Sequence, residues 1–101
     1  MGEIIIKAHK SYREVVAVCD KHLLGKKFLE GERMLDLTGQ FFDGEVFSSE
    51  EAVEKIAFHV REDATFNIIG EGSVALCLKM GIISESGILK VDGIPFALVL
   101  A

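Results

Sequence analysis

The first part of the chain alternates short β-branched segments with polar turns. Residues 3–9 (EIIIKAH) and 14–20 (EVVAVCD) are rich in isoleucine and valine, and the polar stretch KSYR separates them. β-branched runs on either side of a short polar stretch are typical of paired strands. The pattern therefore predicts an N-terminal antiparallel hairpin with a four-residue loop.

The segments that follow are shorter and less regular. KHLLG at residues 21–25 predicts a helical turn that ends at Gly25, because glycine readily adopts the left-handed exit conformation. RMLDLT at 33–38 predicts a strand with imperfect alternation, and EVF at 45–47 predicts a very short one. The stretch GQFFDG, residues 39–44, is expected to form the loop between them.

The clearest helix start lies near the middle of the chain. Ser48 is followed three residues later by Glu51, which is the spacing of a capping box. Apolar residues then recur at helical spacing and predict a face that covers a sheet. These residues are Ala52, Val53, Ile56, Ala57 and Val60.

The last third of the chain predicts a strand, a helix and a hairpin. TFNII at 65–69 is strand-like, SVALCLKM at 73–80 is helix-like, and Asp92-Gly93 separates two apolar runs as in a tight β-turn. The order of elements predicts an α+β fold in one domain, residues 1–101. We expect an N-terminal β-hairpin, a mixed sheet covered by two main helices, and a C-terminal β-hairpin.

Composition narrows the class of protein. The chain has 101 residues, of which 50% are apolar and 27% are charged, as in ordinary globular domains. Its apolar runs are much shorter than the roughly 20 residues of a membrane helix, and its N-terminus lacks a secretory pattern. We therefore expect no membrane contact and a cytoplasmic location. Cys19 and Cys77 lie in apolar runs, so both are expected to be buried free thiols.

Charge is unevenly distributed along the chain, whose net charge is −5. Residues 1–27 carry six lysine and arginine side chains against three acidic ones, a net charge of +3, while the remainder carries five against thirteen, a net charge of −8. The N-terminal hairpin concentrates cations around an aromatic ring, a combination that suits contacts with RNA or another partner. An ordinary polar loop, exposed to water, is the alternative. The candidate residues are Lys7, His9, Lys10, Tyr12 and Arg13.

Two adjacent phenylalanines, Phe41 and Phe42, occupy the predicted loop. Neighbouring side chains of an extended segment point in opposite directions, so an extended loop would leave one ring outside as a docking or dimer contact. We favour a curled loop that buries both rings, and the docking or dimer contact is the alternative.

The stretch FNIIGEGSVALCLKMGII, residues 66–83, contains the spacing G-x-G-x-x-G/A at Gly70, Gly72 and Ala75. That spacing can cradle a dinucleotide, but the carboxylate of Glu71 would repel a phosphate there, and few residues remain for a complete dinucleotide fold. We therefore expect a turn that simply starts a helix, and no cofactor. Binding of an anion at Gly70, Gly72 and Ser73 is the alternative.

Other chemistry has little support in the sequence. Cys19, Asp20 and His22 are close together, but a zinc site needs a second pair of ligands at recognised spacing, so we expect no metal. Neither cysteine nor any serine lies in a recognised nucleophile motif. We therefore expect no catalytic residues.

Several segments together resemble a small archaeal family, domain of unknown function 424. These segments are EVVAVCD, LLGKKF, FFDGE, FNIIGE and GIPFALV, and Asn67, Gly70, Glu71, Gly93 and Pro95 match the signature of the family. The resemblance implies an intracellular protein whose genes often lie near translation genes. Relatives often carry a histidine after that proline, where this chain has Phe96, so a function that used the histidine would differ here.

Two main hypotheses of function follow. The first is a noncatalytic binding module that contacts RNA or ribosomal and translation components through the basic hairpin. The second is a protein, an enzyme among the options, that binds a small molecule or an anion at the glycine turn. A homodimer formed through Phe41, Phe42 or the terminal strand FALVLA is a third arrangement, because an uncovered apolar edge strand needs a partner.

Overall fold

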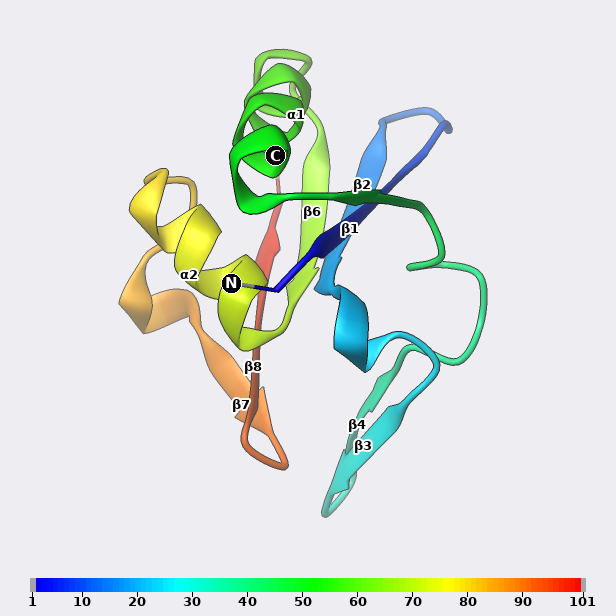
Figure 1. Ribbon diagram of the computed structural model, residues 1–101. Coiled ribbons are helices and arrows are strands. Elements are labelled where there is room, and N and C mark those ends of the chain that lie inside the picture. The colour runs from blue at the N-terminus through cyan, green and yellow to red at the C-terminus, as the bar shows by residue number, and fades with distance from the viewer. Residues whose placement is uncertain (1, 101) are drawn as a thin grey trace.

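A six-stranded mixed sheet forms the centre of the molecule in the computed structural model, which describes residues 2–100 (Figure 1). Its strand order is β5-β1-β2-β6-β8-β7. The strands are β1 (Ile4–His9), β2 (Val15–Asp20), β5 (Glu45–Phe47), β6 (Thr65–Ile69), β7 (Leu89–Val91) and β8 (Ile94–Val99). Only β2 and β6 pair in parallel, and the other neighbours are antiparallel. The predicted α+β class with a mixed sheet is confirmed.

Both hairpins form where the sequence predicts them. In the N-terminal hairpin His9 pairs with Val15, so the loop has five residues, 10–14, and not four. In the C-terminal hairpin Val91 pairs with Ile94 across the turn Asp92-Gly93. Both turn residues have positive φ, 52° and 80°, which is the geometry that favours aspartate or asparagine followed by glycine.

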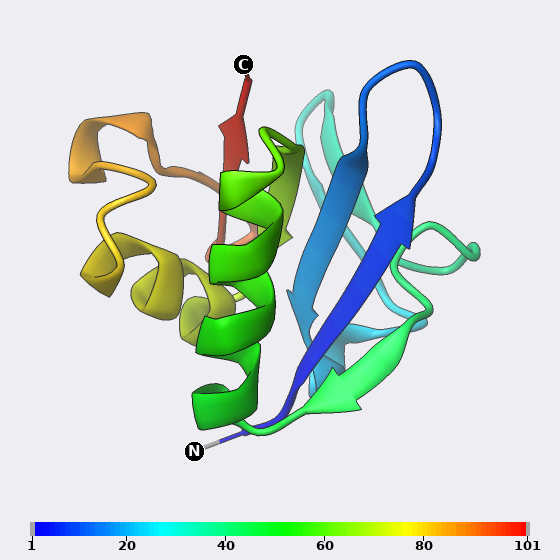
Figure 2. The same ribbon diagram turned by 90° about the horizontal axis from the view of Figure 1, so that it is seen from above.

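Two helices cover the same face of the sheet: α1 (Ser49–Arg61) and α2 (Glu71–Lys79) (Figure 2). The predicted capping box starts α1, since the amide of Glu51 donates to Ser48 Oγ and the amide of Ser48 donates to Glu51 Oε1. The helices and strands enclose the first core, whose central side chains are Ile6, Val16, Val18, Ile56, Phe66, Ile68 and Cys77.

The inward face of α1 is rotated relative to the predicted apolar stripe. Ala52 and Ile56 are buried as expected, but Val60 is 41% exposed and His59 is buried in its place. His59 turns inward because its imidazole meets the carboxylate of Glu14, a residue far away in the sequence. The hydrophobic pattern of the helix alone could not reveal this contact.

A smaller hairpin and the following loop cover the opposite face of the sheet. β3 (Lys27–Glu30) pairs with β4 (Arg33–Asp36), after a 3-10 turn at Lys21–Leu23 that confirms the predicted helical turn. A second 3-10 turn spans Glu85–Gly87. The second core contains Ile5, Ala17, Cys19, Leu23, Leu35, Leu37, Phe42, Ile69 and Val91. The sequence did not predict β3, because its side chains are largely exposed.

Cys19 and Cys77 are fully buried free thiols, one in each core, as predicted. Burial raises the pKa of both to about 12, and the neighbouring Asp20 carboxylate adds to the effect at Cys19. Such thiols are protonated at neutral pH and are poor nucleophiles. The described residues include no helix long and apolar enough to span a membrane.

Gly44 marks a close approach of the loop to β1, and we predict that Gly44→Ala destabilises the protein. A Cβ at this position would overlap the carbonyl oxygen of Ile6 and lie 2.8 Å from Cβ of Lys7. Overpacking of this kind costs about 1–3 kcal/mol of unfolding free energy. Urea unfolding measures the loss. Gly39→Ala in the same loop is the matched control, because a Cβ there meets nothing within 4 Å; equal effects of the two variants would contradict the prediction.

Candidate functional site

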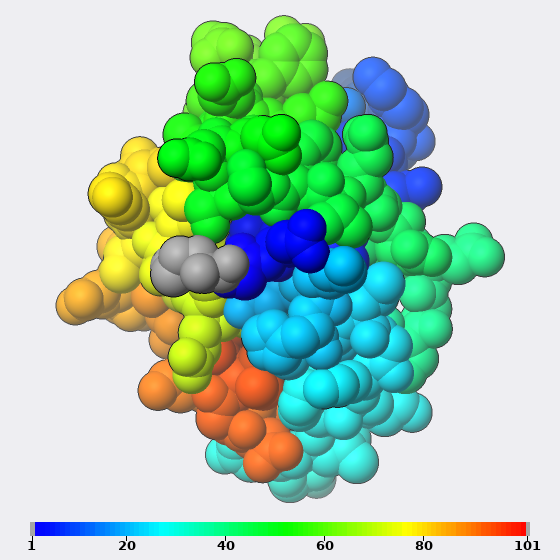
Figure 3. Space-filling view, in the orientation of Figure 1, coloured from blue at the N-terminus to red at the C-terminus, as the bar shows by residue number. Residues whose placement is uncertain are grey.

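The end of the N-terminal hairpin carries the candidate RNA-binding or partner-binding residues. Tyr12 at its tip is fully exposed, and Lys10 beside it has an 89% exposed side chain. Figure 3 shows the hairpin end, in blue, projecting at the upper right of the molecule. An aromatic ring is therefore presented to solvent with a cation next to it.

The hairpin end is attached to the turn between α1 and β6. Arg13 Nη1 donates to the backbone oxygen of Asp63 at 3.0 Å and to its carboxylate at 3.2 Å. The amide of Thr65 donates to the backbone oxygen of Glu14 at 3.0 Å. These bonds connect residues about 50 positions apart, so the loop has a defined position although its surface is polar.

Glu14 joins the hairpin to α1 through its side chain. His59 Nδ1 lies 2.8 Å from Glu14 Oε1, and because a carboxylate can only accept, the imidazole donates from Nδ1. Lys10 Nζ lies 3.4 Å from the other oxygen. Burial by itself would raise the pKa of Glu14, but the hydrogen bond and charge of His59, assisted by Lys10, outweigh it and hold the pKa below its ordinary value.

The remaining hairpin residues face the 38–44 loop. His9 Nε2 lies 2.8 Å from the backbone oxygen of Phe41, and the two rings stack with centroids 4.5 Å apart. Phe41 stays 41% exposed, whereas Phe42 is buried in the second core. The structure thus separates the two phenylalanines and places one of them beside the hairpin. Lys7 is half-buried on the same strand as His9.

The glycine turn at the start of α2 is in contact with a buried carboxylate, which the sequence did not predict. Asp20 at the end of β2 accepts from the amides of Gly72 and Ser73, at 2.9 and 2.7 Å, and from the Ser73 hydroxyl at 2.7 Å. Asp20 is only 6% exposed. The protein's own carboxylate therefore occupies the position that a bound anion would take at the start of α2. Anion binding at Gly70, Gly72 and Ser73 would require this carboxylate to be displaced.

Gly70 allows the carboxylate to approach. Its φ of 115° and ψ of 153° lie in a region that is almost restricted to glycine, and a Cβ there would lie 2.5 Å from Cγ of Asp20. Sequence reasoning weighed Asp20 only as a metal ligand. The sequence does contain a signal for this role. Asp20 is an acidic residue at the end of the buried strand β2, and β2 pairs in parallel with β6, the strand that leads into the glycine turn.

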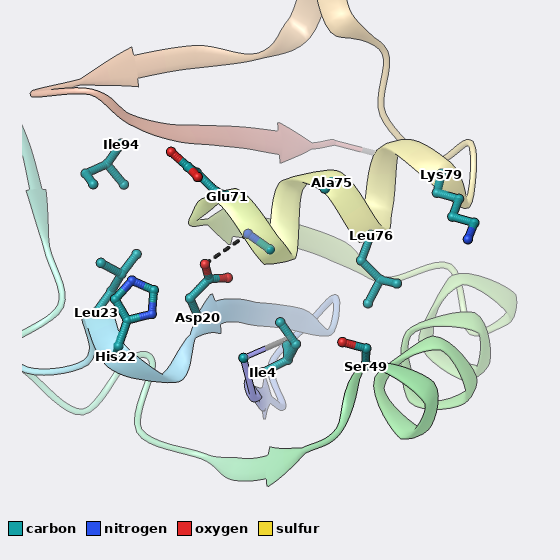
Figure 4. Close-up of a pocket in the computed structure, with 12 residues that line it drawn as sticks. Ile4, Asp20, His22, Leu23, Ser49, Glu71, Ala75, Leu76, Lys79 and Ile94 are labelled. Carbon is teal, nitrogen blue, oxygen red and sulfur yellow. Dashed lines mark hydrogen bonds between the residues drawn. The ribbon is translucent and has the colours of Figure 1, made fainter.

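Beside the hydrogen bonds between Asp20 and the start of α2 lies a cleft of about 680 Å³, which we call the α2 cleft. Figure 4 shows Asp20 in the middle of it, with Glu71 and Ile94 toward one side and Ser49 and Lys79 toward the other. Its apolar lining is Ile4, Leu23, Ala75, Leu76 and Ile94. A volume of this size is typical of sites for small molecules. Among residues 2–100, no three His, Cys, Asp or Glu side chains are grouped so that they could hold a metal ion.

Comparison with solved structures identifies the fold as one that an archaeal protein shares. The chain is similar to an uncharacterized conserved protein from Methanopyrus kandleri, with a TM-score of 0.85 and 24% identity over 97% of this chain and 92% of that one. A family model described as "Protein of unknown function (DUF424)" matches residues 9–101. The chain therefore belongs to the DUF424 family, as the resemblance suggested. No curated protein matches it.

Phe96 pairs with Ile69 and Leu89 in the sheet. Its ring is half-buried against the second core. It is thus part of the sheet face opposite the helices and does not line the α2 cleft.

We predict that Asp20→Ala loses about 2–5 kcal/mol of unfolding free energy, because two amides and a hydroxyl would lose a buried charged acceptor. Asp20→Asn keeps one acceptor oxygen and should lose less. Urea unfolding provides the values, with the exposed Asp43→Ala as a control. A cost for Asp20→Ala no larger than that of the control would contradict the assigned role of Asp20.

The lowered pKa of Glu14 predicts a pH dependence of stability. A carboxyl whose pKa is lower in the folded state stabilises the protein fully above its unfolded pKa, near the ordinary value of 4.5, and this contribution is lost as the pH falls through the folded pKa. We expect Glu14→Gln to flatten the decline of unfolding free energy below about pH 5. Chemical unfolding at a series of pH values measures the slope. Glu54→Gln, which alters an exposed carboxylate of α1, should leave the slope as in the unmodified protein.

Proposed function

We propose that this protein is a noncatalytic binding module that contacts RNA of the translation apparatus through the end of its N-terminal hairpin. The observation that carries the proposal is the complete exposure of Tyr12 on a loop whose next two residues, Arg13 and Glu14, are hydrogen-bonded to the turn before β6 and to the first residue of that strand. A large aromatic side chain gains nothing from such a position in the isolated protein.

Aromatic rings support RNA rather than duplex DNA as the partner. Unpaired bases stack on exposed tyrosine and phenylalanine rings, whereas a regular duplex hides its base faces. Tyr12 offers one such ring, and Phe41 with its stacked His9 offers another at the edge of β1. Both belong to segments at the same end of the sheet.

The cations supply a modest electrostatic attraction. Arg13 makes an exposed ion pair with Asp63, and the exposed ammonium of Lys10 pairs with the largely buried carboxylate of Glu14. An exposed pair is worth about 1 kcal/mol or less, so a phosphate can compete for Arg13, and the exposed ammonium of Lys10 is open to a second acceptor. Since the net charge of the chain is −5, we expect few phosphate contacts and a weak dependence of affinity on salt.

The family supports the link to translation. The resemblance implies genes that lie near translation genes, and this expectation supports an action in the cytoplasm. A homodimer remains compatible with the proposal, because Phe41 is open to a partner of either kind.

The test measures binding of short fluorescent oligouridylate and oligoadenylate by anisotropy at low salt. We expect Tyr12→Ala to weaken binding by about fivefold or more, since stacking on one ring is worth about 1–3 kcal/mol per base. Tyr12 makes no side-chain hydrogen bond within residues 2–100, so its removal should leave the stability unchanged. Lys26→Ala, a change of an exposed cation outside the hairpin, is the matched control.

The proposal fails if the unmodified protein binds neither oligonucleotide, or if Tyr12→Ala and Lys26→Ala bind alike. Capture from an archaeal lysate separates the kinds of partner. Loss of captured translation components after ribonuclease treatment supports RNA. A partner that stays bound after this treatment and is lost with Tyr12→Ala would replace RNA with a protein.

A further inference from the structure

The α2 cleft is lined by the buried carboxylate of Asp20, and the donors at the start of α2 do not fill all of its acceptor positions. Counting donors from residues 2–100, Oδ1 of Asp20 accepts from the amide and hydroxyl of Ser73, while Oδ2 accepts from the amide of Gly72 alone. A carboxylate offers about four acceptor positions, so one position remains on Oδ2. Asp20 lines the cleft, and its small exposed part is available to a molecule bound there.

The charges along the cleft are arranged by sign. Glu71, in the first turn of α2, adds a second carboxylate at the end near Asp20. Lys79 lies eight residues further along the helix, which corresponds to about 12 Å at 1.5 Å per residue, too far to pair with either carboxylate. His22 and Ser49 complete the polar lining. The end formed by Asp20 and Glu71 is therefore complementary to a positive charge.

Apolar side chains lie next to this negative end. Ala75 and Leu76 come from α2, Leu23 from the 3-10 turn after β2, and Ile94 from β8. They offer an apolar wall to a hydrocarbon chain, while the carboxylates offer acceptors to a charged head. A ligand that matches both features has a cationic group on an apolar body.

We propose that the α2 cleft binds a small organic cation, an ammonium group carried on an aliphatic chain. The ammonium donates to Oδ2 of Asp20 and lies near Glu71, and the chain packs against Ala75 and Leu76. This assignment differs from an anion site at the same turn, because the amides that an anion would need already donate to Asp20. It is independent of the proposed RNA contact, which uses the hairpin end.

The test is an amide NMR titration of the full chain with n-pentylammonium, and with n-pentanol and valerate as neutral and anionic probes of the same length. The amides of Gly72 and Ser73 report directly on Asp20 because both donate to it. We expect saturable shifts of these amides with pentylammonium, weaker shifts with pentanol and none with valerate.

Two variants separate the site from general surface effects. Ala75→Phe fills the cleft from an exposed helix position and should weaken binding at least about tenfold without unfolding the protein. Glu71→Gln removes one charge and should weaken it by about two- to fivefold, the value of an exposed ion pair. Glu85→Gln, an exposed carboxylate outside the cleft, is the matched control, and Tyr12→Ala should bind normally.

Three results would overturn the proposal: no saturable shift with pentylammonium, equal shifts with valerate, or unchanged binding in Ala75→Phe. Failure of RNA binding together with intact pentylammonium binding would reject the proposed function and leave the cation site standing. The opposite result would reject the cation site alone.

Discussion

The central strand β2 has a carboxylate at each end, and both helices are attached to the sheet through these two groups. Asp20 accepts from the first turn of α2, and Glu14, directly before the strand, accepts from His59 in the last turn of α1. Apolar packing is not directional, so it alone leaves some freedom in the position of a helix on a sheet. Hydrogen bonds to a largely buried carboxylate have a defined geometry, and losing them leaves a buried charge. The position of each helix is therefore specified from β2.

The same bonds change the chemistry that the surface can offer. Asp20 satisfies the amides that would otherwise attract an anion, and so converts the start of α2 from a positive site into the edge of a negative one. Glu14 and Asp63 pair with the cations of the hairpin, so the aromatic rings become the more distinctive feature there. A sequence motif can therefore suggest one kind of ligand, while the hydrogen bonds that its residues make in the fold favour a different kind.

The features that the sequence predicts well are local. The capping box of α1 and the Asp92-Gly93 turn depend on residues within a few positions of each other, and both form as expected. The features that it misses depend on distant partners. His59 is buried because Glu14, 45 positions earlier, accepts its hydrogen bond, and Asp20 lies 52 positions before Gly72. β3 was missed for a related reason, since its pairing with β4, and not its own pattern, makes it a strand.

The two proposed surfaces lie at opposite ends of β2. The strand has six residues, so the hairpin end and the α2 cleft are about 20 Å apart. No ligand small enough for the cleft can reach the hairpin, and direct competition between the two sites is excluded by this distance. β2 connects the two ends directly, and its neighbours β1 and β6 bond to it along its length. A strand paired on both sides does not readily shift along its axis, because a shift breaks every bond of both ladders. The two sites should therefore fill independently.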